Sequence, residues 1–163
     1  MARLPARLSL KGRALQLLAQ RDQSRVELRA KLLRYAAAEV RARAEGEAGD
    51  DEGEPRQGEV DALLDWLEAH RYLSAERFVE SRVHAREARF GNRRIRAELA
   101  QHGVTLSAEA ASALAESELQ RAAAVRERRF AAPPGDAGER AAQARFLAGR
   151  GFSPEVIQRL LRR

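Results

Sequence analysis

A two-helix pattern broken by a short turn appears three times along this chain. A small residue lies at each turn, at Ser24, Gly91 and Ser153, so the copies are 67 and 62 residues apart. Apolar side chains follow each turn residue after four and eight positions: Leu28 and Leu32, Ile95 and Leu99, Ile157 and Leu161. Residues four apart share one face of a helix, so each copy predicts a helix with one buried face.

Recurrence at this period indicates one helical unit used several times, because a unit of this size buries too little apolar surface alone and stacks on its neighbour. We therefore predict an all-α fold of three tandem three-helix repeats that form an elongated, curved array. The repeats are placed at residues 1–73, 74–131 and 132–163. The third would share part of the long helix before it, and it is truncated if it needs a further helix after residue 163.

Turn and capping residues predict where the helices begin and end. Ser24 with Glu27 has the form of a capping box, and Gly103 suits a left-handed helix end. These signals divide the chain into segments at about 12–20, 24–43, 74–90, 92–103, 107–130, 139–150 and 153 onward. An apolar stripe (Val60, Leu63, Leu64, Leu67) predicts a further helix that closes the first repeat. Proline and glycine at 131–138 predict a break.

An acidic insert separates the first two helices from the stripe that follows. Residues 45–59 read EGEAGDDEGEPRQGE, with seven acids, four glycines and no apolar periodicity. Such a segment cannot bury enough surface to offset the entropy of ordering, so we expect a disordered loop.

Composition supports an intracellular helical protein. Apolar residues make up 44% of the chain, aromatic residues only 5%, and cysteine is absent. The absence of cysteine excludes disulfides and thiolate metal sites, and it fits a reducing compartment. The basic start lacks the apolar core of a secretory signal; it also resembles a mitochondrial transit peptide, but it leads directly into the first repeat. We expect a cytoplasmic protein with no membrane-spanning segment.

Charge is distributed unevenly along the chain. The net charge is +6, with eleven basic residues against three acids in 1–44 and five against one in 141–163. Arg82, Arg86, Arg89 and Arg93 recur at intervals of four, four and three, which predicts one stripe if the helices pack in the ordinary way. Basic surfaces of this kind attract phosphate or acidic protein surfaces. A merely solvated face remains the alternative.

Residues that could perform catalysis are scarce. His70, His84 and His102 lie at unrelated spacings, and neither a P-loop nor an HExxH motif occurs. Trp66 near the end of the apolar stripe favours packing over base stacking. We therefore expect a protein that is not an enzyme and that needs no cofactor or metal.

Several segments resemble the bacterial RecX regulatory protein family, in family order across nearly the whole chain. They are Ala14-Leu15 through Arg21-Asp22-Gln23-Ser24-Arg25-Val26-Glu27-Leu28; Trp66-Leu67 to Tyr72-Leu73 and Phe78; Arg82 and Gly91; Ile95-Arg96-Ala97-Glu98-Leu99 to Gly103-Val104; and Arg145-Phe146-Leu147 to Arg150-Gly151-Phe152-Ser153. Two features depart from the family: the acidic insert, and Ser74-Ala75-Glu76 where adjacent aspartates are common.

The resemblance implies a cytoplasmic, non-enzymatic modulator that lies in the groove of the RecA–DNA filament. It would inhibit strand exchange, ATP hydrolysis and co-protease activity, and so restrain recombination and the SOS response. We expect a monomer that also binds single- and double-stranded DNA weakly and without sequence preference. The candidate residues for binding RecA or the DNA backbone are Arg82, Arg86, Arg89, Arg93, Arg94, Arg96, Arg21, Arg25 and Arg150. A general DNA-binding protein that acts without RecA, and an adaptor for another protein, remain alternatives.

Overall fold

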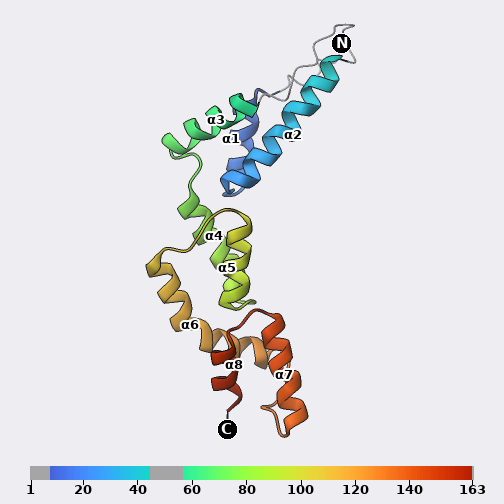
Figure 1. Ribbon diagram of the computed structural model, residues 1–163, viewed down its shortest axis with the longest axis vertical. Coiled ribbons are helices and arrows are strands. Elements are labelled where there is room, and N and C mark those ends of the chain that lie inside the picture. Colours follow the sequence, from blue (N-terminus) through green and yellow to red (C-terminus); the bar gives the residue numbers. More distant parts are fainter. Residues whose placement is uncertain (1–7, 45–56, 163) are drawn as a thin grey trace. The chain divides into compact units, whose positions relative to one another are not determined.

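The computed structural model describes residues 8–44 and 57–162, and within these ranges every regular element is a helix. The elements are α1 (Leu10–Gln20), α2 (Arg25–Ala44), α3 (Gln57–Ala69), α4 (Ala75–Glu87), α5 (Asn92–Gln101), α6 (Ala108–Glu127), α7 (Ala137–Gly149) and α8 (Pro154–Leu161) (Figure 1). The all-α prediction is confirmed. The chain divides into two compact units, Met1–Phe78 and Val79–Arg163.

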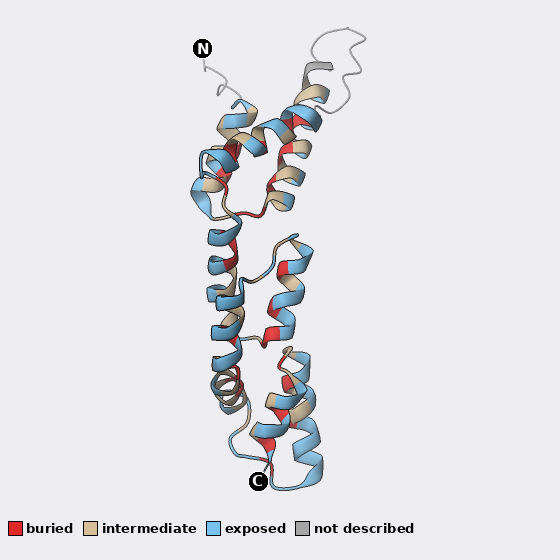
Figure 2. Ribbon diagram, turned by 60° about the vertical axis from the view of Figure 1, so that its left-hand side comes forward, coloured by how far each residue is buried: buried red, intermediate tan, exposed pale blue. Residues whose placement is uncertain are grey.

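The first unit is built from α1, α2 and α3. Its core gathers Ala14 and Leu17 of α1, Leu28 and Leu32 of α2, and the stripe of α3, of which Val60, Leu64 and Leu67 are fully buried. Leu63 and Trp66 pack against this core from its edge, so the predicted stripe and the packing role of Trp66 are confirmed. Figure 2 shows these buried positions on the inner sides of the three helices.

The second unit contains the other two copies of the repeated pattern. Ile95 and Leu99 of α5 are buried, as are Ile157 and Leu161 of α8. The core around α8 takes Ala122 and Val125 from α6 and Leu147 from α7. The C-terminal half of α6 therefore packs with α7 and α8 as a third helix, and α6 also contacts α5 (Figure 1).

Most predicted helix ends agree with the structure. The Ser24 hydroxyl accepts a hydrogen bond from the Glu27 amide, and the hydroxyls of Ser107 and Ser153 cap α6 and α8 in the same way. Gly103 has φ 69°, as expected for a left-handed end.

The starts of α3 and α7 lie two or three residues before the approximate positions predicted for them. The acidic insert does not extend to Glu59, because α3 begins at Gln57. Glu59 lies in the first turn of α3, where an acidic side chain interacts favourably with the helix dipole. The remaining insert residues, 45–56, lie outside the described ranges.

Helix α7 begins two residues before the predicted start at Glu139. The Asp136 carboxylate accepts a hydrogen bond from the Glu139 amide at 2.8 Å, and the Glu139 carboxylate accepts one from the Gly135 amide at 2.7 Å. This reciprocal capping begins the helix inside the segment that glycine and proline had predicted as a break.

The turn before α5 and the turn before α8 are joined by their backbones. The amide of Gly91 donates to the carbonyl of Arg150 at 2.9 Å, and the amide of Arg93 donates to the carbonyl of Gly151 at 3.0 Å. A Cβ atom on Gly91 would lie 2.2 Å from the backbone nitrogen of Phe152, which no packing tolerates. Gly151 adopts φ 83°, in the left-handed region.

A buried carboxylate of α6 holds both turns. Glu118, 4% exposed, accepts hydrogen bonds from the Asn92 amide at 3.0 Å and from the Ser153 amide at 3.2 Å. The Ser153 hydroxyl also donates to it at 3.1 Å. Glu118 thus lies at the N-termini of α5 and α8, where free amides and the helix dipole favour an anion.

Arg121 adds a cation to this joint. Its guanidinium donates to the carbonyls of Phe90 (2.9 Å) and Leu114 (2.9 Å) and to the side chain of Asn92. Burial lowers the pKa of Arg121, and the charges of Glu118 and Glu87 oppose that effect. Because Glu118 and Arg121 lie in the same network, neither of these buried charges is left uncompensated.

We predict that Gly91→Ala destabilises the protein by about 3 kcal/mol or more, because the new Cβ would force the two turns apart. Gly149→Ala is the matched control: nothing lies within 4 Å of its Cβ position. That variant should change stability by less than about 1 kcal/mol. Urea unfolding of both variants measures the difference, and equal stabilities would show that the close approach at Gly91 has been misassigned.

Candidate partner interface

The two candidate arginines of the first unit are engaged in ion pairs within that unit. Arg21 pairs with Glu27, and Arg25 reaches Asp65 of α3 at 2.7 Å and Glu68 at 2.6 Å. Their neighbour Arg29 pairs with Asp61 at 2.6 Å. These guanidinium groups link α2 to α3 and the turn to α2, so their charge is largely compensated inside the fold.

In the second unit, one carboxylate binds two of the four arginines of the predicted stripe and leaves the other two unpaired among the described residues. Arg82 and Arg86 of α4 both pair with Glu98 of α5, at 3.3 and 3.0 Å. All three side chains are half-buried, with 20–35% of their surface exposed. Arg82 and Arg86 therefore fasten α4 to α5, and the cationic surface begins beyond them.

Four of the candidate arginines lie around one aromatic ring. Their guanidinium carbons are 5.9 Å (Arg86), 5.8 Å (Arg89), 4.4 Å (Arg94) and 5.6 Å (Arg150) from the centre of the Phe90 ring. They come from α4, the following turn, α5 and the end of α7, which the joined turns bring together. A cation over an aromatic ring contributes about 0.5–1 kcal/mol at an exposed site, and Arg94 lies nearest to the ring centre, at 4.4 Å.

The candidate surface is the set of second-unit arginines that were predicted from the sequence and that carry no ion pair with any residue of the described ranges. We call it the α5 cationic surface, and it consists of Arg89, Arg93, Arg94, Arg96 and Arg150. All except half-buried Arg150 are exposed. The structure thus brings together five of the nine candidates and places the other four in ion pairs.

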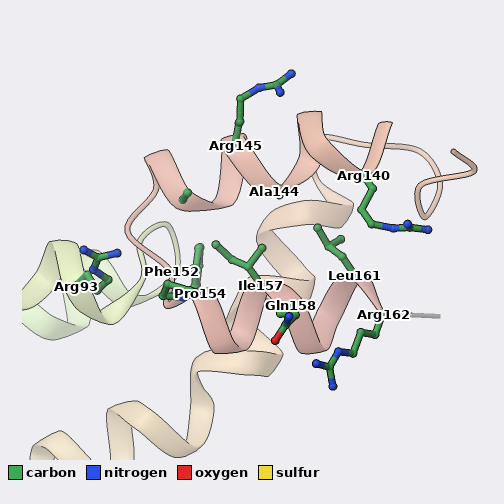
Figure 3. Close-up of a pocket in the computed structure, with 11 residues that line it drawn as sticks. Arg93, Arg140, Ala144, Arg145, Phe152, Pro154, Ile157, Gln158, Leu161 and Arg162 are labelled. Atoms are coloured by element: carbon green, nitrogen blue, oxygen red, sulfur yellow. The ribbon is translucent and has the colours of Figure 1, made fainter. Parts of the chain in front are cut away.

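Sequence reasoning missed a groove between α7 and α8. It has a volume of about 700 Å³, and its apolar lining comes from Ala144 and Ala148 of α7 and from Phe152, Ile157 and Leu161 (Figure 3). In the sequence, the groove is marked only by two alanines one helical turn apart, Ala144 and Ala148. That spacing does not identify a groove, because small residues four apart also occur where two helices pack closely.

Comparison with known proteins agrees with this architecture. The family model described as RecX, third three-helix domain, matches residues 116–161. Proteins named Regulatory protein RecX align along most of the chain. The one from Herbaspirillum seropedicae is 47% identical, over 93% of this chain and 88% of the relative. Those from Ralstonia nicotianae and Leptothrix cholodnii are 46% and 44% identical, over 94% and 99% of this chain and 87% and 93% of the relatives.

The chain belongs to the RecX family of regulatory proteins. The resemblance seen in its sequence motifs is therefore confirmed, as are the tandem helical repeats. The segment matched by the third RecX domain begins inside α6, in agreement with the packing of Ala122 and Val125 against α7 and α8.

Other kinds of site receive no support from the described part of the chain. No group of three or more histidine, aspartate or glutamate side chains there could hold a metal ion. No helix in those ranges is long and apolar enough to cross a membrane. The relatives of this RecX-family chain carry the name of regulatory proteins.

The ion pairs of Glu27 predict a pH dependence of stability. Burial raises the pKa of Glu27, but hydrogen bonds and charge from Arg21 and Lys31 outweigh it and lower the pKa from 4.5 to about 2. The folded pKa lies below the unfolded one, so this stabilisation is complete above about pH 4.5 and is lost as the pH falls toward about 2. Exposure of Arg21 to solvent limits this stabilisation to about 1 kcal/mol.

Glu27→Gln should therefore be less stable than the unmodified protein at about pH 6 and should approach it at about pH 2.5. Unfolding free energies from urea titration at both pH values measure this convergence. A difference that stays constant between the two would contradict the assigned ion pairs.

Proposed function

We propose that this RecX-family protein binds the RecA–DNA filament and modulates RecA, mainly by inhibiting its recombinase, ATPase and co-protease activities. It would act in the cytoplasm as a monomer, without catalysing a reaction, and so restrain recombination and the SOS response. The observation that carries this proposal is family membership along nearly the whole chain, because the RecX resemblance implies RecA as the partner.

The α5 cationic surface supplies a physical means of binding such a filament. Arg93, Arg94 and Arg96 are exposed on α5, and none has a carboxylate partner in the described ranges. A DNA backbone and the acidic patches of a filament both attract such a surface, which raises the rate of encounter. A filament also repeats its surface, so several weak contacts can combine into tight binding.

A general DNA-binding protein that acts without RecA is the second candidate function. Arginines around the half-buried Phe90 ring favour it, since basic and aromatic side chains together are typical of surfaces that bind single strands. Affinity based on about six phosphates would fall with a log–log salt slope of about −5 for duplex DNA. Contact with protein alone would give a much flatter slope.

RecA's ATP hydrolysis on single-stranded DNA, measured while this protein is titrated, tests the proposal. We expect inhibition at amounts well below one molecule per RecA, because a molecule bound in the filament groove affects adjacent RecA protomers. A matched titration measures binding to the same DNA without RecA. Tight DNA binding without inhibition would support the second candidate function and contradict the first.

A further inference from the structure

The groove between α7 and α8 combines an apolar floor with cationic ends. Phe152, Ile157 and Leu161 also belong to the core around α8 and are at most 8% exposed, so the floor is the outer edge of that core and the two alanines of α7 supply its more accessible apolar surface. Ala144 is half-buried and Ala148 is exposed. Both alanines therefore present apolar surface to the groove. No described segment of the second unit covers this edge.

Four arginines line the groove, and its lining contains no acidic residue: Arg93, Arg140, Arg145 and Arg162. In Figure 3, Arg140 and Arg162 lie near Leu161 at one end, and Arg93 lies near Phe152 and Pro154 at the other. None of the four guanidinium groups makes an ion pair within the described ranges. In the first unit, by contrast, the arginines of α2 reach carboxylates of α3.

We propose that this groove binds an acidic peptide segment of a partner protein, with apolar side chains on the floor and carboxylates toward the flanking arginines. The inference does not depend on RecA being that partner. Charge complementarity favours this occupant. When the apolar face of the peptide lies on the floor, its carboxylates can reach the arginines at both ends of the groove.

The dimensions and chemistry of the groove fit a short peptide better than nucleic acid. The eight residues of α8 extend over about 12 Å, the length of about two turns of a docked helix. Amphipathic helices bind such grooves through apolar residues at i, i+3, i+4 and i+7. A phosphate backbone has no apolar group for the floor, and the aromatic residue of the lining, Phe152, is only 1% exposed and cannot stack on a base.

The probe is a fluorescein-labelled helical peptide of about four turns, with leucines at that spacing and glutamates elsewhere, titrated with the full chain and followed by fluorescence anisotropy. A second peptide with serine in place of leucine has the same charge. We expect the leucine peptide to bind about tenfold more tightly, because only its leucines fill the floor. Equal binding of the two peptides, or no binding of the leucine peptide, would overturn the proposal.

Two pairs of variants locate the binding site. Ala148→Glu places a carboxylate in the groove and should weaken peptide binding about tenfold, whereas Ala142→Glu adds the same charge at an exposed position of α7 outside the lining and should have little effect. Arg140→Ala should weaken binding about threefold. Arg159→Ala removes an exposed charge of α8 outside the lining and should have less than half that effect on affinity.

The arginine pair keeps the test decisive if Ala148→Glu does not fold, which circular dichroism would show. If Arg140→Ala and Arg159→Ala lowered the affinity for the peptide equally, the effect would come from the net charge of the protein, and this would contradict a specific binding groove. If Ala148→Glu and Arg140→Ala lowered affinity for a single-stranded oligonucleotide but not for the peptide, the groove would bind nucleic acid instead. RecA is absent from every arm, so the result is independent of the proposed regulation.

Discussion

The hydrogen bonds of Glu118 determine how the second unit is assembled. Gly91 precedes α5 and has no side chain with which to cap it, because a Cβ there would collide with Phe152. Glu118 of α6 compensates for this by accepting the Asn92 amide, and it holds Ser153 at the start of α8 as well. One carboxylate therefore fixes two helix N-termini, and with them the turns that carry Arg89 and Arg150.

The arginines therefore have two different roles: some form ion pairs inside the fold, and others remain available to a partner. In the first unit, Arg21, Arg25 and Arg29 are compensated by carboxylates of the same fold. In the second unit, Glu98 engages Arg82 and Arg86, while the α5 cationic surface beyond it keeps its charge available. The number of arginines in a segment therefore says little about where a partner binds, because carboxylates of the same unit compensate several of them.

Local and periodic features of this structure could be predicted from sequence. The positions four and eight residues after each turn are buried in all three copies, and Ser24 forms the cap that its pairing with Glu27 predicts. The helices expected from about residues 107 and 153 begin there and are capped by Ser107 and Ser153. Both features depend on residues within two turns of one helix.

The features that sequence reasoning missed depend on packing between distant segments. Glu118 lies 26 residues from Asn92 and 35 from Ser153, and Arg25 lies 40 residues from Asp65. No pattern along the chain marks such pairs, so five of nine candidate arginines form the α5 cationic surface and four do not. The groove likewise exists only once α7 and α8 are placed side by side.

The affinity of two double variants for RecA filaments on single-stranded DNA would show whether the α5 cationic surface binds the partner. Arg94→Ala with Arg96→Ala removes two charges from the α5 cationic surface, and Arg21→Ala with Arg25→Ala removes two that are internally paired. We expect affinity to fall about tenfold for the first variant and less than about twofold for the second. Equal losses, or a larger loss for the second variant, would contradict this role of the surface.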